Sequence, residues 1–155
     1  MTSTHGPLRI DWGTGENAAR EIAVHRGKRR ITKGMVLDYW YGGTTTHVSV
    51  WTTKGTSTTT NSKVMALVAG IATTETEPYV DITTKTMVAR VGIRQVLATG
   101  TITVGKIMRK SATWPGVARC EAGDPGDYQG FAFADESVTL THRRLVRAIV
   151  LPWRI

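Results

Sequence analysis

The residues that come nearest to a known chemical motif lie close to the N-terminus, in Gly13-Thr14-Gly15-Glu16-Asn17-Ala18. This run fits Gly-x-Gly-x-x-Ala, in which a tight turn and a helix N-terminus hold a pyrophosphate, and Asp38 follows at about the place of a ribose-binding acid. That chemistry needs a helix that opens inside a parallel βαβ sheet. Glu16 would add negative charge at the phosphates, and the rest of the chain lacks the helices that cover a parallel sheet. We therefore interpret the segment as a glycine turn in an N-terminal arm.

The side chains that could support nucleophilic or metal chemistry are one cysteine and four histidines. Cys120 is a candidate nucleophile with His25, His47 or His142 as base, but no spacing connects them. Its alternating surroundings favour a small strand or core residue instead. Neither paired zinc ligands nor a calcium loop with enough oxygens is visible. The sequence thus predicts a protein that is not an enzyme, with no catalytic residue, no metal and no cofactor.

Positive charge is the clearest indication of a partner. The chain has 20 Lys and Arg against 12 Asp and Glu, a net charge of +8, and the basic residues concentrate in Arg26–Lys33 and His142–Arg154. Such an excess favours an acidic partner: nucleic acid, an anionic membrane or an acidic protein surface. The aromatic residues are dispersed rather than grouped as in RNA-binding motifs. Specific nucleic-acid binding is therefore not indicated, although a basic nucleic-acid-binding β-barrel stays as the alternative function.

The apolar stretches and the N-terminus bear on location. Runs such as Val64–Ala69 are far shorter than the roughly 18 residues that a membrane-spanning helix needs. No apolar signal region is visible in Met1–Pro7, so the default expectation is a protein made in the cytoplasm, with no membrane partner.

The elements that must position these residues are predicted to be strands. The 155 residues include 25 Thr, 15 Val and 10 Ile, whose β-branched side chains suit a pleated sheet. Short β-rich runs alternate with turn residues from Ile31 onward, as in a sandwich or small barrel. We predict an all-β fold with an extended N-terminal arm at 1–30 and a β-barrel or β-sandwich body at 31–155. The Thr-rich stretch from Gly42 to Ser62 predicts a long, exposed β-hairpin.

A short internal repeat suggests how the body is built. Ile31-Thr32-Lys33-Gly34-Met35-Val36 and Ile102-Thr103-Val104-Gly105-Lys106-Ile107 share the order Ile-Thr-x-Gly-x-aliphatic, 71 positions apart. The repeat predicts two similar turns, each leading into a strand of one barrel, in a pseudo-duplicated β architecture.

The C-terminal part of the chain carries a recognisable pattern. It consists of Thr99–Met108, a turn at Trp114-Pro115-Gly116 followed by Val117-Ala118, then Gln129–Asp135 and Arg144–Val150. Over residues 98–151, and more faintly over Ile31–Tyr41, the chain resembles the small capsid decoration (cement) proteins of tailed bacteriophages. The resemblance implies a compact β-barrel or β-tulip and a non-enzymatic virion structural protein. Such a protein stabilises an icosahedral capsid by bridging major capsid protein subunits, often as a trimer. We therefore expect a homotrimer on the virion, with the major capsid protein as partner.

Two groups of residues are the candidates for intersubunit contact. The arm contributes three apolar side chains, and the C-terminal region contributes Arg and Trp, which are enriched at interface hot spots. A tryptophan next to a chain end rarely finds full cover within its own domain, so Trp153 is the sharpest choice. The complete set is Leu8, Ile10, Trp12, Arg143, Arg144, Trp153 and Arg154.

Overall fold

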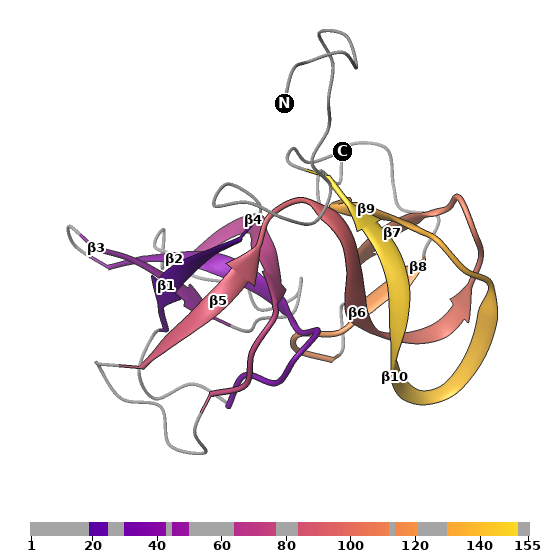
Figure 1. Cartoon of the computed structure of the whole chain (residues 1–155), viewed down its shortest axis with the longest axis horizontal. Helices are drawn as coiled ribbons and strands as arrows, with labels where there is room; N and C mark the ends of the chain where they lie inside the picture. Colours follow the sequence, from indigo (N-terminus) through magenta and orange to yellow (C-terminus); the bar gives the residue numbers. More distant parts are fainter. Residues whose placement is uncertain are drawn as a thin grey trace, which may run out of the picture.

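The computed structural model describes residues 19–24, 30–42, 45–49, 64–76, 84–111, 114–120 and 130–151. All helix-or-strand structure in these ranges is β, so the prediction of an all-β fold is confirmed. The described strands form two groups of five, which we call the first unit and the second unit. Figure 1 shows the two units side by side. Within the described ranges, no helix has the length and apolar character to cross a membrane.

The first unit is a five-stranded sheet in the order β1-β5-β4-β2-β3. Its strands are β1 (Ala19–Ala23), β2 (Val36–Gly42), β3 (Thr45–Ser49), β4 (Val64–Ala72) and β5 (Lys85–Ala89). All its strand pairs are antiparallel, and a parallel bridge between Val24 and Val48 joins its two edges. The sheet closes around a core that includes Leu37, Val48 and Val88, each fully buried.

The second unit is a closed five-stranded barrel. Its strands are β6 (Gly92–Ile102), β7 (Ile107–Lys110), β8 (Ala118–Cys120), β9 (Ala132–Ala134) and β10 (Val138–Val150). Buried and exposed residues alternate along the last part of β10, where Val146, Ala148 and Val150 point into the barrel. Phe131, the largest fully buried side chain, packs in the same core.

The structure describes only parts of the predicted N-terminal arm and of the predicted Thr-rich hairpin. Of the range expected as an arm, Ala19–Val24 forms β1 and the bridge to Val48, whereas residues 1–18 and 25–29 lie outside the described residues. Of the expected Thr-rich hairpin, β3 pairs with β2 from Thr45 to Ser49, and residues 50–63 lie outside the described part. Val48 is fully buried, so this strand contributes to the core as well as to the surface.

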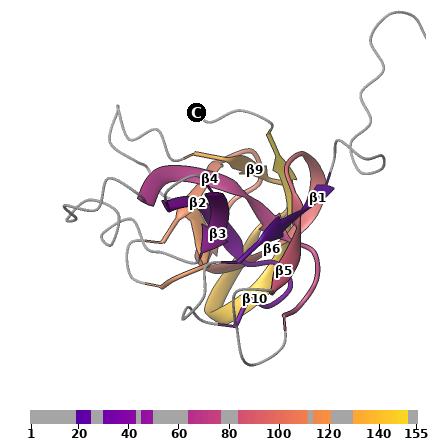
Figure 2. The ribbon, with the colours of Figure 1, turned by 90° about the vertical axis from the view of Figure 1, so that its left-hand side faces the viewer.

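The two units have the same strand plan. Starting from β6, the order around the barrel is β6-β10-β9-β7-β8, and these strands take the places of β1-β5-β4-β2-β3. The parallel pair Ala98↔Ala118 closes the second unit where Val24↔Val48 closes the first. The predicted duplication is therefore present, and it gives two five-stranded units rather than two turns in one barrel. Figure 2 looks onto the first unit, with β6 and β10 behind it.

The repeated hexapeptide forms the same turn in both units. Met35 N–H donates to the Thr32 carbonyl at 3.2 Å, and Lys106 N–H donates to the Thr103 carbonyl at 3.0 Å. The glycine between them has φ of +90° at Gly34 and +82° at Gly105, a conformation that side chains with a Cβ rarely adopt.

Each turn also exchanges two backbone hydrogen bonds with an alanine of the neighbouring strand. Gly34 N–H donates to Ala72 O, and Ala72 N–H donates to Met35 O. Gly105 N–H donates to Ala134 O, and Ala134 N–H donates to Lys106 O. The repeat in the sequence therefore encodes a repeated backbone structure.

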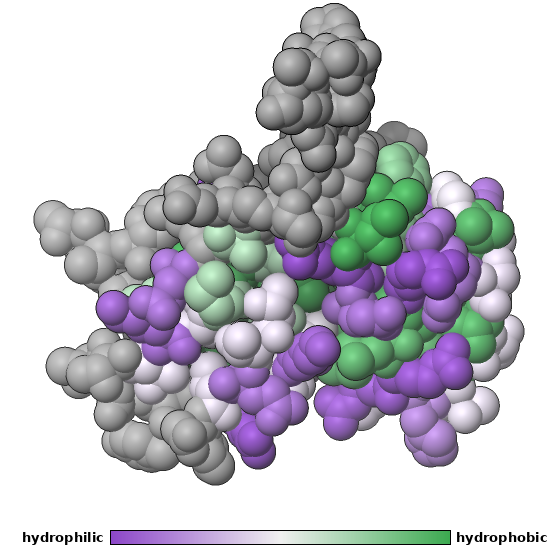
Figure 3. Space-filling view, viewed as in Figure 1, coloured by the Kyte–Doolittle hydropathy of each residue, from purple (hydrophilic) through white to green (hydrophobic). Residues whose placement is uncertain are grey.

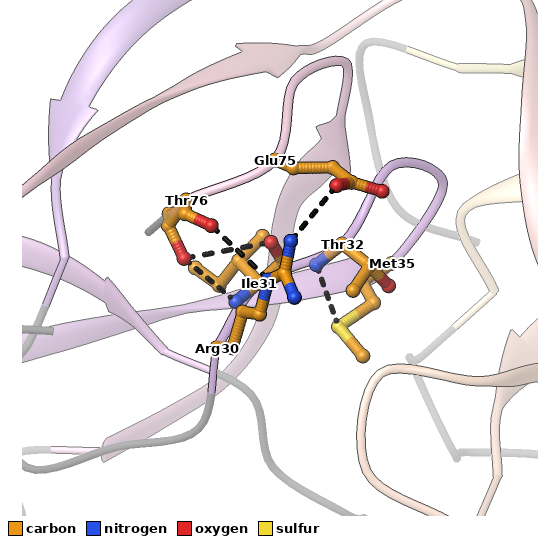
Figure 4. Close-up of polar contacts among 6 residues, drawn as sticks. All are labelled: Arg30, Ile31, Thr32, Met35, Glu75 and Thr76. Carbon is orange, nitrogen blue, oxygen red and sulfur yellow. Dashed lines mark hydrogen bonds and ion pairs between the residues drawn. The ribbon is translucent and has the colours of Figure 1, made fainter. Parts of the chain in front are cut away.

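Several side chains connect the Gly34 turn to neighbouring segments of the first unit. Figure 4 shows that Ile31 N–H donates to Thr76 Oγ1 at 3.0 Å and that Thr32 N–H donates to Met35 Sδ at 3.4 Å. Arg30 reaches the Thr76 carbonyl and pairs with Glu75 at 3.1 Å. These contacts tie the segment that carries the Gly34 turn to the segment that follows β4.

The boundary itself is bonded and apolar. Leu97 N–H of β6 donates to Gly34 O at 2.7 Å, and Val36 N–H of β2 donates to Gly116 O at 2.9 Å. Val36 and Ile71 of the first unit belong to the same apolar cluster as the interior of the second unit. An ion pair of 3.0 Å between Asp38 of β2 and Lys110 of β7 joins the units, and both side chains are almost fully buried.

Candidate interaction surface

The structure describes two of the seven residues that the sequence selected for intersubunit contact. Arg143 and Arg144 both lie on β10 and both are exposed. The other five lie outside the described residues: Leu8, Ile10, Trp12, Trp153 and Arg154. The surface is therefore built from β10 and its neighbours.

A bulge in β10 presents the two arginines. β10 pairs with β6 from Val138 to Leu140 and again from Arg144 to Val150, and the register shifts between Leu140 and Arg144. Residues 141–145 are all exposed, in contrast to the alternation that follows. A bulge breaks the strict alternation of a strand and redirects its side chains, which explains why consecutive residues here face solvent.

Trp114 completes the surface from the turn between β7 and β8. The Arg143 guanidinium lies over the Trp114 ring, 5.7 Å from its centroid, while half of Trp114 is exposed. The turn is firmly held, because Trp114 N–H donates to Ser111 Oγ at 3.0 Å and Ser111 N–H donates to Val117 O at 2.7 Å. Sequence reasoning assigned Trp114 only to a turn. Its position before Pro-Gly was the signal that this tryptophan is exposed.

The next two arginines of β10 are paired with carboxylates. Arg144 lies 3.7 Å from Glu136, and Arg147 Nε donates to Asp135 Oδ2 at 2.7 Å. The hydrogen bond that Arg147 donates to Asp135, together with the negative charge of Asp135, raises the pKa of Arg147. Arg143 therefore differs from its neighbours, because it stacks on an aromatic ring that is itself exposed.

The net positive charge of the chain is spread over both units. In the full sequence, residues 19–91 contain ten Lys and Arg and five Asp and Glu, and residues 92–151 contain eight and five. Of the two basic runs expected from the sequence, the structure describes Arg30 to Lys33 and residues 142–151.

The candidate reactive groups are placed in structural roles. Cys120 is half-buried against the barrel core, and burial raises the pKa of its thiol, which favours the less nucleophilic neutral form. Its prediction as a small strand residue is confirmed. Asp38 lies on an antiparallel strand and pairs with Lys110, while Gly13–Ala18 lies outside the described residues. Among the described residues, no three His, Cys, Asp or Glu side chains are grouped to hold a metal ion.

The fold of this chain is similar to that of a protein of known structure. No protein-family model and no curated protein matches the sequence. Among solved structures, the chain is similar to the N base of head fiber gp8.5 of bacteriophage phi29, with a TM-score of 0.55 and 16% sequence identity. The match covers 88% of this chain and 96% of that chain, so it includes both units.

Proposed function

We propose that this chain is a virion structural protein of a tailed bacteriophage, which decorates and stabilises the icosahedral capsid by bridging major capsid protein subunits. The observation that carries the proposal is the likeness to the base of a head fiber over nearly the whole of that chain. A base is the part by which an appendage is attached, and the match extends over both units of this chain. The same proposal includes a homotrimer as the form bound to the virion.

The surface around Trp114 and Arg143 supports this role through its chemistry. Tryptophan and arginine are the residue types most enriched at interface hot spots, and here they are stacked, exposed and carried by a rigid turn and strand. The Trp114–Arg143 pair belongs to the second unit, and the net charge of +8 of the whole chain would steer the protein toward an acidic capsid exterior. We therefore assign capsid contact to the second unit.

Co-sedimentation with capsids of the virus that encodes the chain tests the proposal. The wild-type protein should bind saturably, and Arg143→Gln should weaken binding by roughly tenfold, about 1.4 kcal/mol. Arg30→Gln is the control, because Arg30 is a half-exposed arginine of the first unit that pairs with Glu75 rather than stacking on an exposed ring. A protein that stays in the supernatant at every concentration overturns the capsid role, and equal losses in both variants overturn the assignment to the second unit.

Nucleic-acid binding is the second candidate, because the structure brings an aromatic ring and a cation together on the surface of a chain with a net charge of +8. Stacking on aromatic side chains beside cations is how single-stranded nucleic acids are bound without sequence preference. Titration with a short single-stranded DNA at increasing salt separates the two functions. Nucleic-acid binding predicts an affinity that falls steeply and linearly in log units with salt, and a loss of that affinity in Trp114→Ala.

A further inference from the structure

A row of four apolar side chains crosses the outer side of the second unit. Ile93 of β6 pairs with Ile149 of β10, Ile149 pairs with Phe133 of β9, and Phe133 pairs with Ile107 of β7. Their neighbours Ala148, Ala132 and Met108 point into the core, so by strand alternation these four point outward. We call this row the belt. Ile93 is 52% exposed and the other three are half-buried. Figure 3 shows apolar patches between hydrophilic ones on this unit.

The first unit has the equivalent row, and there it is covered. By the strand equivalence, Ala19 pairs with Ala89, Ala89 with Ile71, and Ile71 with Val36. Ala89, Ile71 and Val36 are at most 1% exposed. Ile71 and Val36 belong to the apolar cluster of the second unit, so that unit is what covers this row. The belt is the equivalent row in the second unit, and no other described part of the chain covers it as the second unit covers the row of the first.

The glycine turn next to each row shows the same difference. The Gly34 turn is seated on the second unit, where its carbonyl accepts from Leu97 N–H, and a Cβ on Gly34 would collide with the Leu145 side chain. A Cβ on Gly105 would meet nothing within 4 Å, and Val104 beside it is 57% exposed. The chain thus contains one docked copy of this turn and one exposed copy.

We propose that the belt and the Thr103–Lys106 turn dock on the first unit of a second copy of this chain, as the equivalent row and turn dock on the second unit within one chain. The residues of the first unit that would contact the belt and the turn follow from aligning the β1–β5 register with the β6–β10 register. Ala23, Glu21 and Lys85 of the first unit stand where Leu97, Gln95 and Leu145 stand in the second. The side chains of Glu21 and Lys85 are each 59% exposed and lie 3.6 Å apart.

The residue exchanges define the character of the contact. Lys106 stands where Met35 stands in the docked turn, and Glu21 and Lys85 stand where the second unit has Gln95 and Leu145. The contact between copies is therefore more polar than the contact within the chain, and it weakens as salt screens its charges. It joins two different surfaces, so it generates a closed ring if its rotation closes and a filament if it does not. The inference does not depend on capsid binding.

Cross-linking of mixed single variants tests the orientation of the contact. Val104→Cys and Glu21→Cys are each made in a Cys120→Ser chain, so that the new thiol is unique, and are treated with a short bismaleimide separately and as a mixture. The proposal expects a cross-linked dimer in the mixture and little product in either variant alone. A dimer formed by Val104→Cys alone shows that two belts face each other, and it overturns the head-to-tail contact.

Light scattering of the unmodified protein during size exclusion tests whether the contact forms. The proposal expects a mass above that of the monomer, which falls as protein is diluted or salt is raised. Ile93→Asp should weaken the association by roughly tenfold or more, equivalent to about 1.4 kcal/mol. Thr139→Asp is the control for added charge, because Thr139 is an exposed residue of β10 outside the belt. A wild-type monomer at every concentration and salt, or equal effects of both substitutions, overturns the proposal.

Discussion

The two units of this chain share one strand plan and one glycine turn, but they differ in what surrounds them. In the first unit the outward apolar row is buried and the turn is seated on the second unit. In the second unit the equivalent row is partly exposed and the turn is open. The two copies of the duplicated backbone therefore differ in burial. The apolar row of the first unit is covered by the second unit, whereas the equivalent row of the second unit is partly exposed to solvent.

The two units differ most in the apolar row on their outer side, and this row is where a partner is expected. An exposed apolar side chain on a surface needs no explanation by itself. Here the first unit shows what the same surface does when a partner is present, because Val36 and Ile71 are buried by the second unit. The capsid surface around Trp114 and Arg143 and the belt are separate features of the second unit, and separate experiments test them.

The largest expected effect concerns the ion pair that joins the units. Lys110→Met leaves the Asp38 carboxylate buried without its cation, so the free energy of unfolding should fall by about 3–5 kcal/mol in urea titrations. The double variant Asp38→Leu, Lys110→Met removes both charges and should recover most of the loss. Lys85→Met breaks an exposed pair of the first unit and should cost at most about 1 kcal/mol. Similar losses for the buried and exposed pairs would contradict the burial of the boundary.

The next effect compares the two glycines. Gly34→Ala and Gly105→Ala both place a Cβ on a residue with positive φ, which costs about 1–2 kcal/mol. Gly34→Ala also forces Leu145 aside and brings the new Cβ to 3.1 Å from Leu97 N, which should add about 1–3 kcal/mol. Thermal or urea unfolding measures both. Equal destabilisation would show that the Gly34 turn is not seated on the second unit.

A smaller effect sharpens the description of the exposed surface. The stacking of Arg143 on Trp114 should give a coupling free energy of about 0.5–1 kcal/mol in a double-mutant cycle with Trp114→Ala and Arg143→Ala. Each variant alone should leave the cooperativity of unfolding unchanged, because both side chains are at the surface. A coupling of zero would mean that the two side chains are not held together in solution.

The smallest effect concerns the one thiol of the chain. Burial raises the pKa of Cys120, so less thiolate is present at a given pH than in a free cysteine peptide. The rate of alkylation by iodoacetamide should therefore rise with pH through a midpoint above that of the peptide. Unfolding in urea should move the midpoint back to the peptide value. A midpoint below that of the peptide would indicate an activated thiol and would reopen the question of nucleophilic chemistry.

Local features of the fold were predictable from the sequence. The β-branched composition predicts strands, and the Ile-Thr-x-Gly-x-aliphatic repeat predicts two equal turns because only glycine suits their positive φ. The exposed position of Arg143 also follows from a basic run near the chain end. These features depend on neighbours in the sequence or on single residues.

Long-range pairings were beyond sequence reasoning. Nothing in the surroundings of Asp38 indicates that Lys110, 72 positions away, is its partner, or that Val24 meets Val48 in parallel. The contact of Arg143 with Trp114 depends on a bulge in β10, which shifts side chains that strict alternation would place elsewhere. The duplication into two five-stranded units was foreseen only as a repeated turn, because the strand pairings that define each unit join residues far apart in the sequence.

The first unit is docked on the second through the Gly34 turn, and amide hydrogen exchange at Leu97 measures this docking. Leu97 N–H donates across the boundary to Gly34 O at 2.7 Å, so its exchange should be as slow as that of core amides such as Val96. In Gly34→Ala the exchange at Leu97 should accelerate, while Val146 in the barrel core stays protected. Exchange at Leu97 in the wild-type protein as fast as at the exposed Lys33 would contradict the docking of the two units.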